Sequence, residues 1–173
     1  PREYKTMVLD EQEAVLESVY PVTIKGQEDI EIRPRVDGFI DQIYVDEGAV
    51  VKQGQVLFQI NSPQSEQALT SAKAAVESAK ASVATAQLNV DRIRPLAEKN
   101  IVSEVQLRTV ENALENSKAS QAQALATLRN AQASMGWTRV SSPVNGVVGS
   151  IPFRKGSLVN SSNVLTTVAN TSN

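Results

Sequence analysis

The chain contains the stretch Ile32-Arg33-Pro34-Arg35-Val36-Asp37-Gly38-Phe39-Ile40, which continues to Ile60. A stretch with the same pattern begins 108 residues later with Val140-Ser141-Ser142-Pro143-Val144-Asn145-Gly146-Val147-Val148 and continues to Val168. The two stretches align without a gap. Their identical residues are glycines and apolar side chains, the positions that backbone geometry and core packing constrain most: Val36/Val144, Gly38/Gly146, Ile43/Ile151, Gly48/Gly156, Val51/Val159, Val56/Val164 and Leu57/Leu165. Two matching halves split by an insertion are expected to close on each other, so the insertion should leave and return at nearly one point.

The sequence of each half predicts short strands joined by tight turns. In the first half we expect strands over 39–45 and 56–60, with a turn at Gly48, where glycine can supply a positive φ. Residues 30–61 and 137–169 are therefore predicted to form one β-sandwich. Its predicted core consists of repeated apolar positions: Val36, Ile43, Val56, Leu57, Val144, Ile151, Val164 and Leu165.

The segment between the halves, residues 62–136, is predicted to be a helical hairpin. Ser62-Pro63 offers an N-cap and a proline at the first helical position, and Ser103-Glu104-Val105-Gln106 has the form of a capping box. Apolar and small residues recur at heptad a and d positions over about 63–97 and 103–135, which predicts an antiparallel coiled coil. Gly136 is the expected helix stop, and Ser117 with Gln121 forms one polar layer, which is either a tolerated defect or a device that sets the register.

Composition excludes several functions. The 173 residues carry a net charge of −2, are 41% hydrophobic and 4% aromatic, and contain neither cysteine nor histidine. Thiol nucleophiles, disulfides, imidazole bases and the usual zinc ligands are therefore unavailable, and the balanced charge argues against a nucleic-acid partner. We find no convergent set of catalytic groups and predict no enzyme activity, metal site or cofactor site.

The two ends predict a further domain. Two strand-like runs, 4–9 and 15–24, precede the first half and have no partner within the repeat. We interpret residues 1–29 as N-terminal strands of a β-barrel or membrane-proximal region. Residues 170–173 are expected to be a truncated linker toward that β-barrel.

The half-pattern, with Gly38, Gly48 and Gly54 spaced between apolar pairs, resembles a half-motif of the biotinyl/lipoyl domain, a flattened β-sandwich with pseudo-twofold symmetry. A sandwich of this kind interrupted by a long α-hairpin resembles the periplasmic adaptor proteins, or membrane fusion proteins, of tripartite RND-type multidrug efflux pumps. The resemblance implies an α+β fold. It also implies a periplasmic location in a Gram-negative bacterium, an inner-membrane anchor, and no cofactor.

Family members carry Arg-x3-Leu-x6-Ser at the hairpin tip, and this chain has Arg92, Leu96 and Ser103 at that spacing around its predicted tip. The resemblance implies that these residues dock onto a TolC-like outer-membrane channel. It further implies an inner-membrane RND transporter as partner and self-association into a ring, commonly a hexamer.

Other interpretations also fit the sequence. An adaptor of an ATP-driven exporter or type I secretion system is the alternative, and another small β-sandwich would also fit the glycine turns. A biotin or lipoyl carrier would need a modifiable lysine in the turn between the halves. The candidate lysines instead lie on the predicted hairpin: Lys73, Lys80, Lys99 and Lys118. A purely structural coiled-coil protein would not require the gap-free β repeat.

Overall fold

A computed structural model of the protein describes residues 28–171; the strands expected within 1–27 lie outside the described residues. The chain divides into two compact units. We call residues 28–34, 39–59 and 140–171 the β unit, and residues 35–38 and 60–139 the hairpin unit.

The strands form two four-stranded sheets that draw equally on both halves of the repeat. The first half supplies β1 (Asp29–Ile32), β2 (Gly38–Ile43), β3 (Val50–Val51) and β4 (Val56–Asn61). The second half supplies β5 (Arg139–Ser141), β6 (Gly146–Val148), β7 (Leu158–Val159) and β8 (Thr166–Asn170). The strand orders are β1-β8-β6-β3 and β5-β4-β2-β7. Because each sheet mixes strands from both halves, the halves close on each other as predicted, and the α+β fold class is confirmed.

The buried core of the β unit follows the same 108-residue repeat as the sequence. Residues that are equivalent under the 108-residue offset are buried to the same degree, with 0–1% of their surface exposed: Ile40 and Val148, Val51 and Val159, Leu57 and Leu165. The predicted core was only partly right. Val36, Leu57 and Leu165 are buried, whereas five other predicted residues are half-buried: Ile43, Val56, Val144, Ile151 and Val164. Identity between the halves therefore does not measure burial.

The repeated glycines Gly38 and Gly146 lie where a neighbouring strand leaves no room for a side chain. A Cβ atom on Gly146 would sit 2.2 Å from the carbonyl oxygen of Ala169. On Gly38 it would sit 2.3 Å from the carbonyl oxygen of Asn61, which is the equivalent residue of the first half. Since a backbone carbonyl cannot rotate away, only glycine allows these strands to pair at this distance.

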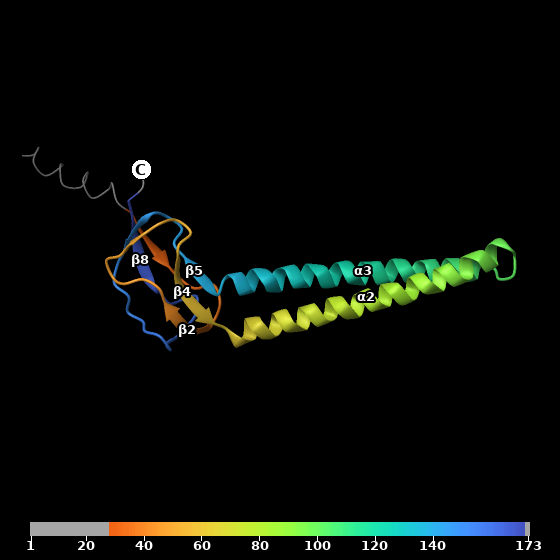
Figure 1. The fold of residues 1–173 in the computed structure, drawn as a ribbon, viewed down its shortest axis with the longest axis horizontal. Helices are drawn as coiled ribbons and strands as arrows, with labels where there is room; N and C mark the ends of the chain where they lie inside the picture. The colour runs from red at the N-terminus through yellow and green to blue at the C-terminus, as the bar shows by residue number, and fades with distance from the viewer. Residues whose placement is uncertain (1–27, 172–173) are drawn as a thin grey trace, which may run out of the picture. The chain divides into compact units, whose positions relative to one another are not determined.

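The hairpin unit holds two long helices, α2 (Pro63–Glu98) and α3 (Glu104–Gly136), which lie side by side in Figure 1. They run antiparallel, because one apolar cluster joins Val76 and Ala79 to Ala124, and the next along α2 joins Val90 to Leu114, earlier in α3. Helix α3 ends at Gly136 as predicted, but by a different mechanism. Gly136 does not have a positive φ, and Trp137 in an αR conformation is the C-cap.

The ends of the two helices are tied together at the base of the hairpin. The Ile60 N–H donates to the Thr138 carbonyl at 2.7 Å. The hydroxyl of Ser62, which caps α2 as predicted, accepts from the Ser65 N–H at 3.3 Å, and the hydroxyls of Ser65 and Ser134 lie 3.4 Å apart. The inserted segment thus leaves and returns at one point.

Although α2 and α3 are long, neither they nor any other helix in residues 28–171 is apolar enough over its length to span a bilayer.

Candidate docking site at the hairpin tip

The turn at the end of α2 has a defined backbone rather than an open loop. The Ile101 N–H donates to the Leu96 carbonyl at 2.8 Å, and the Asn100 N–H donates to the Ala97 carbonyl at 3.0 Å. This pair of bonds is a Schellman motif, which closes a helix through one residue in the left-handed region. Asn100 is that residue, with φ of 62°. Asparagine tolerates this conformation better than most side chains, so it replaces the usual glycine.

The start of α3 is equally well defined. Ser103 is the N-cap, and its hydroxyl accepts from the Gln106 N–H at 3.1 Å, which confirms the predicted cap. A capping hydroxyl satisfies one of the backbone donors that a helix leaves unpaired at its first turn. The loop from Lys99 to Ser103 is therefore held at both ends by the helices that it joins.

The three predicted docking residues lie around this loop. Arg92 and Leu96 lie one turn apart near the end of α2, and Ser103 lies across the loop at the start of α3. Arg92 is exposed, with one long hydrogen bond of 3.4 Å from its guanidinium to the Asn89 amide oxygen, whereas Leu96 is half-buried. Within residues 28–171 these three side chains do not hydrogen-bond one another. The site can therefore offer a planar cationic donor beside apolar surface.

Two apolar residues at the tip were missed by the sequence analysis. Ile101 is 65% exposed and Val105 is 67% exposed, so both present more apolar surface than half-buried Leu96 does. An isoleucine directly after a left-handed asparagine is the signal that could have indicated Ile101, because this position commonly carries an apolar residue. Near the tip, Arg94 and Glu111 join the two helices by an ion pair of 3.2 Å.

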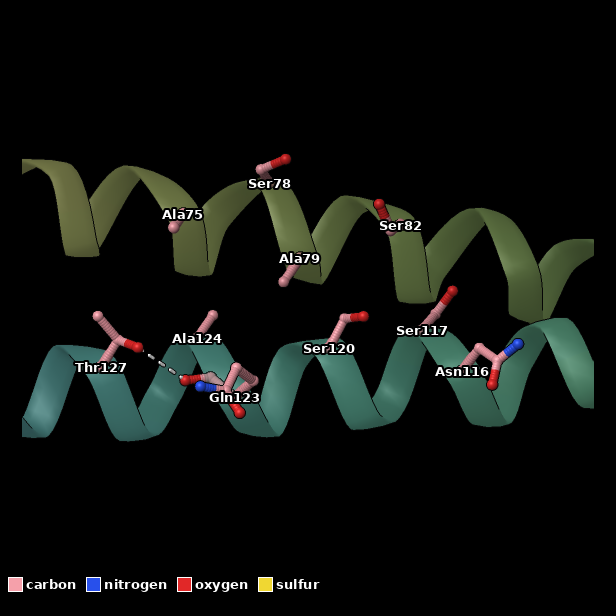
Figure 2. A pocket seen from close by; sticks show the side chains of 10 residues that line it. All are labelled: Ala75, Ser78, Ala79, Ser82, Asn116, Ser117, Ser120, Gln123, Ala124 and Thr127. Atoms are coloured by element: carbon pink, nitrogen blue, oxygen red, sulfur yellow. Dashed lines mark hydrogen bonds between the residues drawn. The ribbon is translucent and has the colours of Figure 1, made fainter.

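A shallow hollow of about 560 Å³ interrupts the packing halfway along the hairpin (Figure 2). Figure 2 shows that Ala79 of α2 faces Ser120 and Ala124 of α3 there, with Ser117 beside them. Of the predicted polar layer, Ser117 lines this hollow and Gln121 does not. Alanine and serine side chains are too small to fill the space between the helices here. No charged side chain lines the hollow.

Known proteins identify this architecture. The model of the RND membrane fusion protein (RND MFP) barrel-sandwich hybrid domain matches residues 28–171. The chain belongs to the RND membrane fusion protein family. Among curated relatives of this family, the multidrug resistance protein MdtA of Klebsiella pneumoniae is 30% identical over 127 residues, which are 73% of this chain and 31% of MdtA. The chain thus spans under a third of the length of that relative. MdtA of an Escherichia coli strain is 29% identical over the same shares.

Solved structures of membrane fusion proteins share the fold. MacA from Actinobacillus actinomycetemcomitans superposes with a TM-score of 0.64 at 28% identity, over 83% of this chain and 51% of MacA. ZneB from Cupriavidus metallidurans superposes with a TM-score of 0.63 at 27% identity, over 83% of this chain and 61% of ZneB.

Proposed function

We propose that the chain is the sandwich and hairpin part of a periplasmic adaptor subunit in a tripartite multidrug efflux pump. The subunit links an inner-membrane RND transporter to a TolC-like outer-membrane channel. The observation that supports this most directly is the family match over residues 28–171, which covers both the β strands and the hairpin. The multidrug resistance name of the MdtA relatives supports the efflux role.

The proposal extends to the whole subunit. It lies in the periplasm of a Gram-negative bacterium, is anchored to the inner membrane, and self-associates into a ring, with a hexamer as the expected state. Within it, 30–61 and 137–169 act as the two sandwich halves and 62–136 as the hairpin. The adaptor couples and seals the conduit and performs no chemistry.

The hairpin tip is the proposed channel contact. Arg92 supplies a donor for carbonyl or carboxylate groups, and Leu96 supplies an apolar anchor. Ser103 acts through the cap of α3, in which its hydroxyl accepts from the Gln106 N–H and fixes the tip backbone. A capped helix and a closed turn present the contact residues in one conformation, which lowers the entropy cost of docking.

Charge reversal at Arg92 tests this contact. Arg92→Asp should leave helicity unchanged, because the side chain is exposed and its hydrogen bond is long. Channel affinity should fall by about 2–5 kcal/mol, the usual cost of removing one partner of a desolvated charged contact. Arg129→Asp is the matched control, since Arg129 is an exposed arginine of α3 away from the tip. Circular dichroism and affinity for the purified channel are the paired readouts.

Variants at two further tip residues distinguish direct contact with the channel from stabilisation of the tip backbone. Leu96→Asp should weaken docking with a small loss of stability, because Leu96 is half-buried. Ser103→Ala should lose about 1 kcal/mol of helix stability, whereas Ser103→Asp keeps a capping group. Unchanged channel binding by both Arg92→Asp and Leu96→Asp would refute the docking role of the tip.

The partners themselves can be captured in cells. A photo-crosslinking residue at Ile101 of the full-length protein, followed by mass spectrometry, should capture an outer-membrane channel. Co-purification of the full-length protein should bring down an RND transporter. Recovery of an ATP-driven transporter instead would assign the adaptor to that class of exporter.

A further inference from the structure

Two turns of the β unit have the same backbone and opposite charge. Under the 108-residue offset, Asp46-Glu47-Gly48 is equivalent to Arg154-Lys155-Gly156. Both glycines have positive φ, 83° and 93°. Each glycine N–H donates to the equivalent carbonyl of the other half: Gly48 to Val148 at 2.8 Å, and Gly156 to Ile40 at 2.7 Å. The fold thus presents one turn shape twice, once acidic and once basic.

Each charged turn leads into an edge strand that carries an exposed apolar residue. β3 is the last strand of one sheet and β7 is the last strand of the other. Val50 on β3 is 77% exposed, and Leu158, its equivalent on β7, is 68% exposed. Each edge therefore places one exposed apolar side chain beside exposed charges of a single sign. We call these surfaces the acidic edge (residues 46–50) and the basic edge (residues 154–158).

The charges on both edges are available to a partner. Asp46, Arg154 and Lys155 are exposed, and their side chains make no ion pair or hydrogen bond with any residue of 28–171. Glu47 differs, because its carboxylate accepts from the Ile151 N–H at 2.7 Å. That bond holds the acidic turn in place while Asp46 is left free.

We propose that the acidic edge of one copy of this chain binds the basic edge of a second copy. Val50 would pack beside Leu158, and Asp46 would face Arg154 and Lys155. Like edges cannot pair in this way, because their equal charges would lie opposite each other. Where each copy uses its two edges on two different neighbours, the contact is heterologous and can repeat around a ring. The inference rests on the proposed self-association and names the surfaces that carry it.

Cysteine cross-linking tests the pairing, since the 173-residue chain contains no cysteine of its own. Val50→Cys and Leu158→Cys are made in separate preparations of the full chain, mixed, and oxidised. The proposal expects a disulfide between positions 50 and 158 in clear excess over 50–50 and 158–158 products. Salt of about 1 M, at which the Debye length is about 3 Å, should lower the yield.

Charge reversal supplies the second arm. Asp46→Lys in the Val50→Cys chain should slow formation of the 50–158 disulfide by about tenfold, because like charges then face each other. Adding Arg154→Glu and Lys155→Glu to the Leu158→Cys chain should restore it. Asp41→Lys is the control, since Asp41 is an exposed acid on β2 outside the acidic edge.

Each outcome bears on the proposal. Excess 50–158 product with rescue by swapped charges supports it. Equal amounts of all three products, an excess of 50–50 product, or indifference to Asp46→Lys would overturn it. Failure of the unaltered protein to bind the channel, with the 50–158 disulfide still formed, would refute the channel role and leave the inference intact. Normal channel docking without the disulfide overturns the inference alone.

Discussion

Gly146 tests whether strand spacing in the β unit depends on a missing side chain. In Gly146→Ala the new Cβ would lie 2.2 Å from the Ala169 carbonyl oxygen and 2.6 Å from Cγ1 of Val168. Gly146 does not have a positive φ, so the whole cost is steric. Val168 is fully buried and cannot move aside, because the core around it is filled.

Strands β6 and β8 must therefore move apart. They pair antiparallel through Gly146–Asn170, Val147–Ala169 and Val148–Val168. Overpacking a filled core costs about 1–3 kcal/mol. Weakening one ladder hydrogen bond adds about 1 kcal/mol. We expect a total loss of about 2–4 kcal/mol in the free energy of opening of this sheet.

Native-state hydrogen exchange of the β6 and β8 amides measures this loss. At about 1.4 kcal/mol per factor of ten, exchange in Gly146→Ala should speed up by about 30-fold to about 1,000-fold. Gly136→Ala is the control, because no atom lies within 4 Å of a Cβ built there. Its helix should be unchanged or gain up to about 1 kcal/mol. Wild-type exchange rates in Gly146→Ala would show that the sheet yields easily, and the steric explanation would fail.

Three other changes probe the core, the hairpin and the tip. Leu57→Ala should lose about 2–5 kcal/mol in urea unfolding, because Leu57 is fully buried; a loss below about 1 kcal/mol would contradict the assigned core. Ala79→Pro should cost about 3 kcal/mol or more, lower the helical circular dichroism and abolish efflux, while the β8 amides stay protected. Asn100→Val should cost about 1–2 kcal/mol at its positive φ, and Asn100→Gly should not, as judged by the melting temperature of the helical signal.

The sequence predicted best what local geometry requires. Gly48 and Gly156 were predictable as turn residues, because a positive φ favours glycine over every other residue. The caps at Ser62 and Ser103 were predictable for a similar reason, since a helix start needs a short acceptor side chain. Such requirements act within a few residues and leave a mark in the local sequence.

Burial and exposure were predicted less well, because they depend on which strands become neighbours. Ile43 and Ile151 are identical yet half-buried, while Phe58 and Thr166 differ and are both buried. At the tip, an apolar residue after a left-handed helix end usually packs against the last helical turn, whereas Ile101 after Asn100 is 65% exposed. The docking role of Arg92, Leu96 and Ser103 stays a prediction until the variants above are measured.

The short link between Ile60 and Thr138 has a consequence for the order of folding. Closing a flexible loop of the intervening length would cost about 4 kcal/mol of chain entropy before any strand of the second half could pair with the first. Contacts within an antiparallel helix pair are comparatively local, and such contacts form early. Once α2 and α3 have packed together along their length, Ile60 and Thr138 are already close enough to form their 2.7 Å hydrogen bond. Pulse-labelled hydrogen exchange should therefore find α2 amides protected before those of β8; the reverse order would exclude this route. During folding the long insertion thus brings the two halves of the repeat together, so that strands far apart in the sequence can pair as if they were close in the chain.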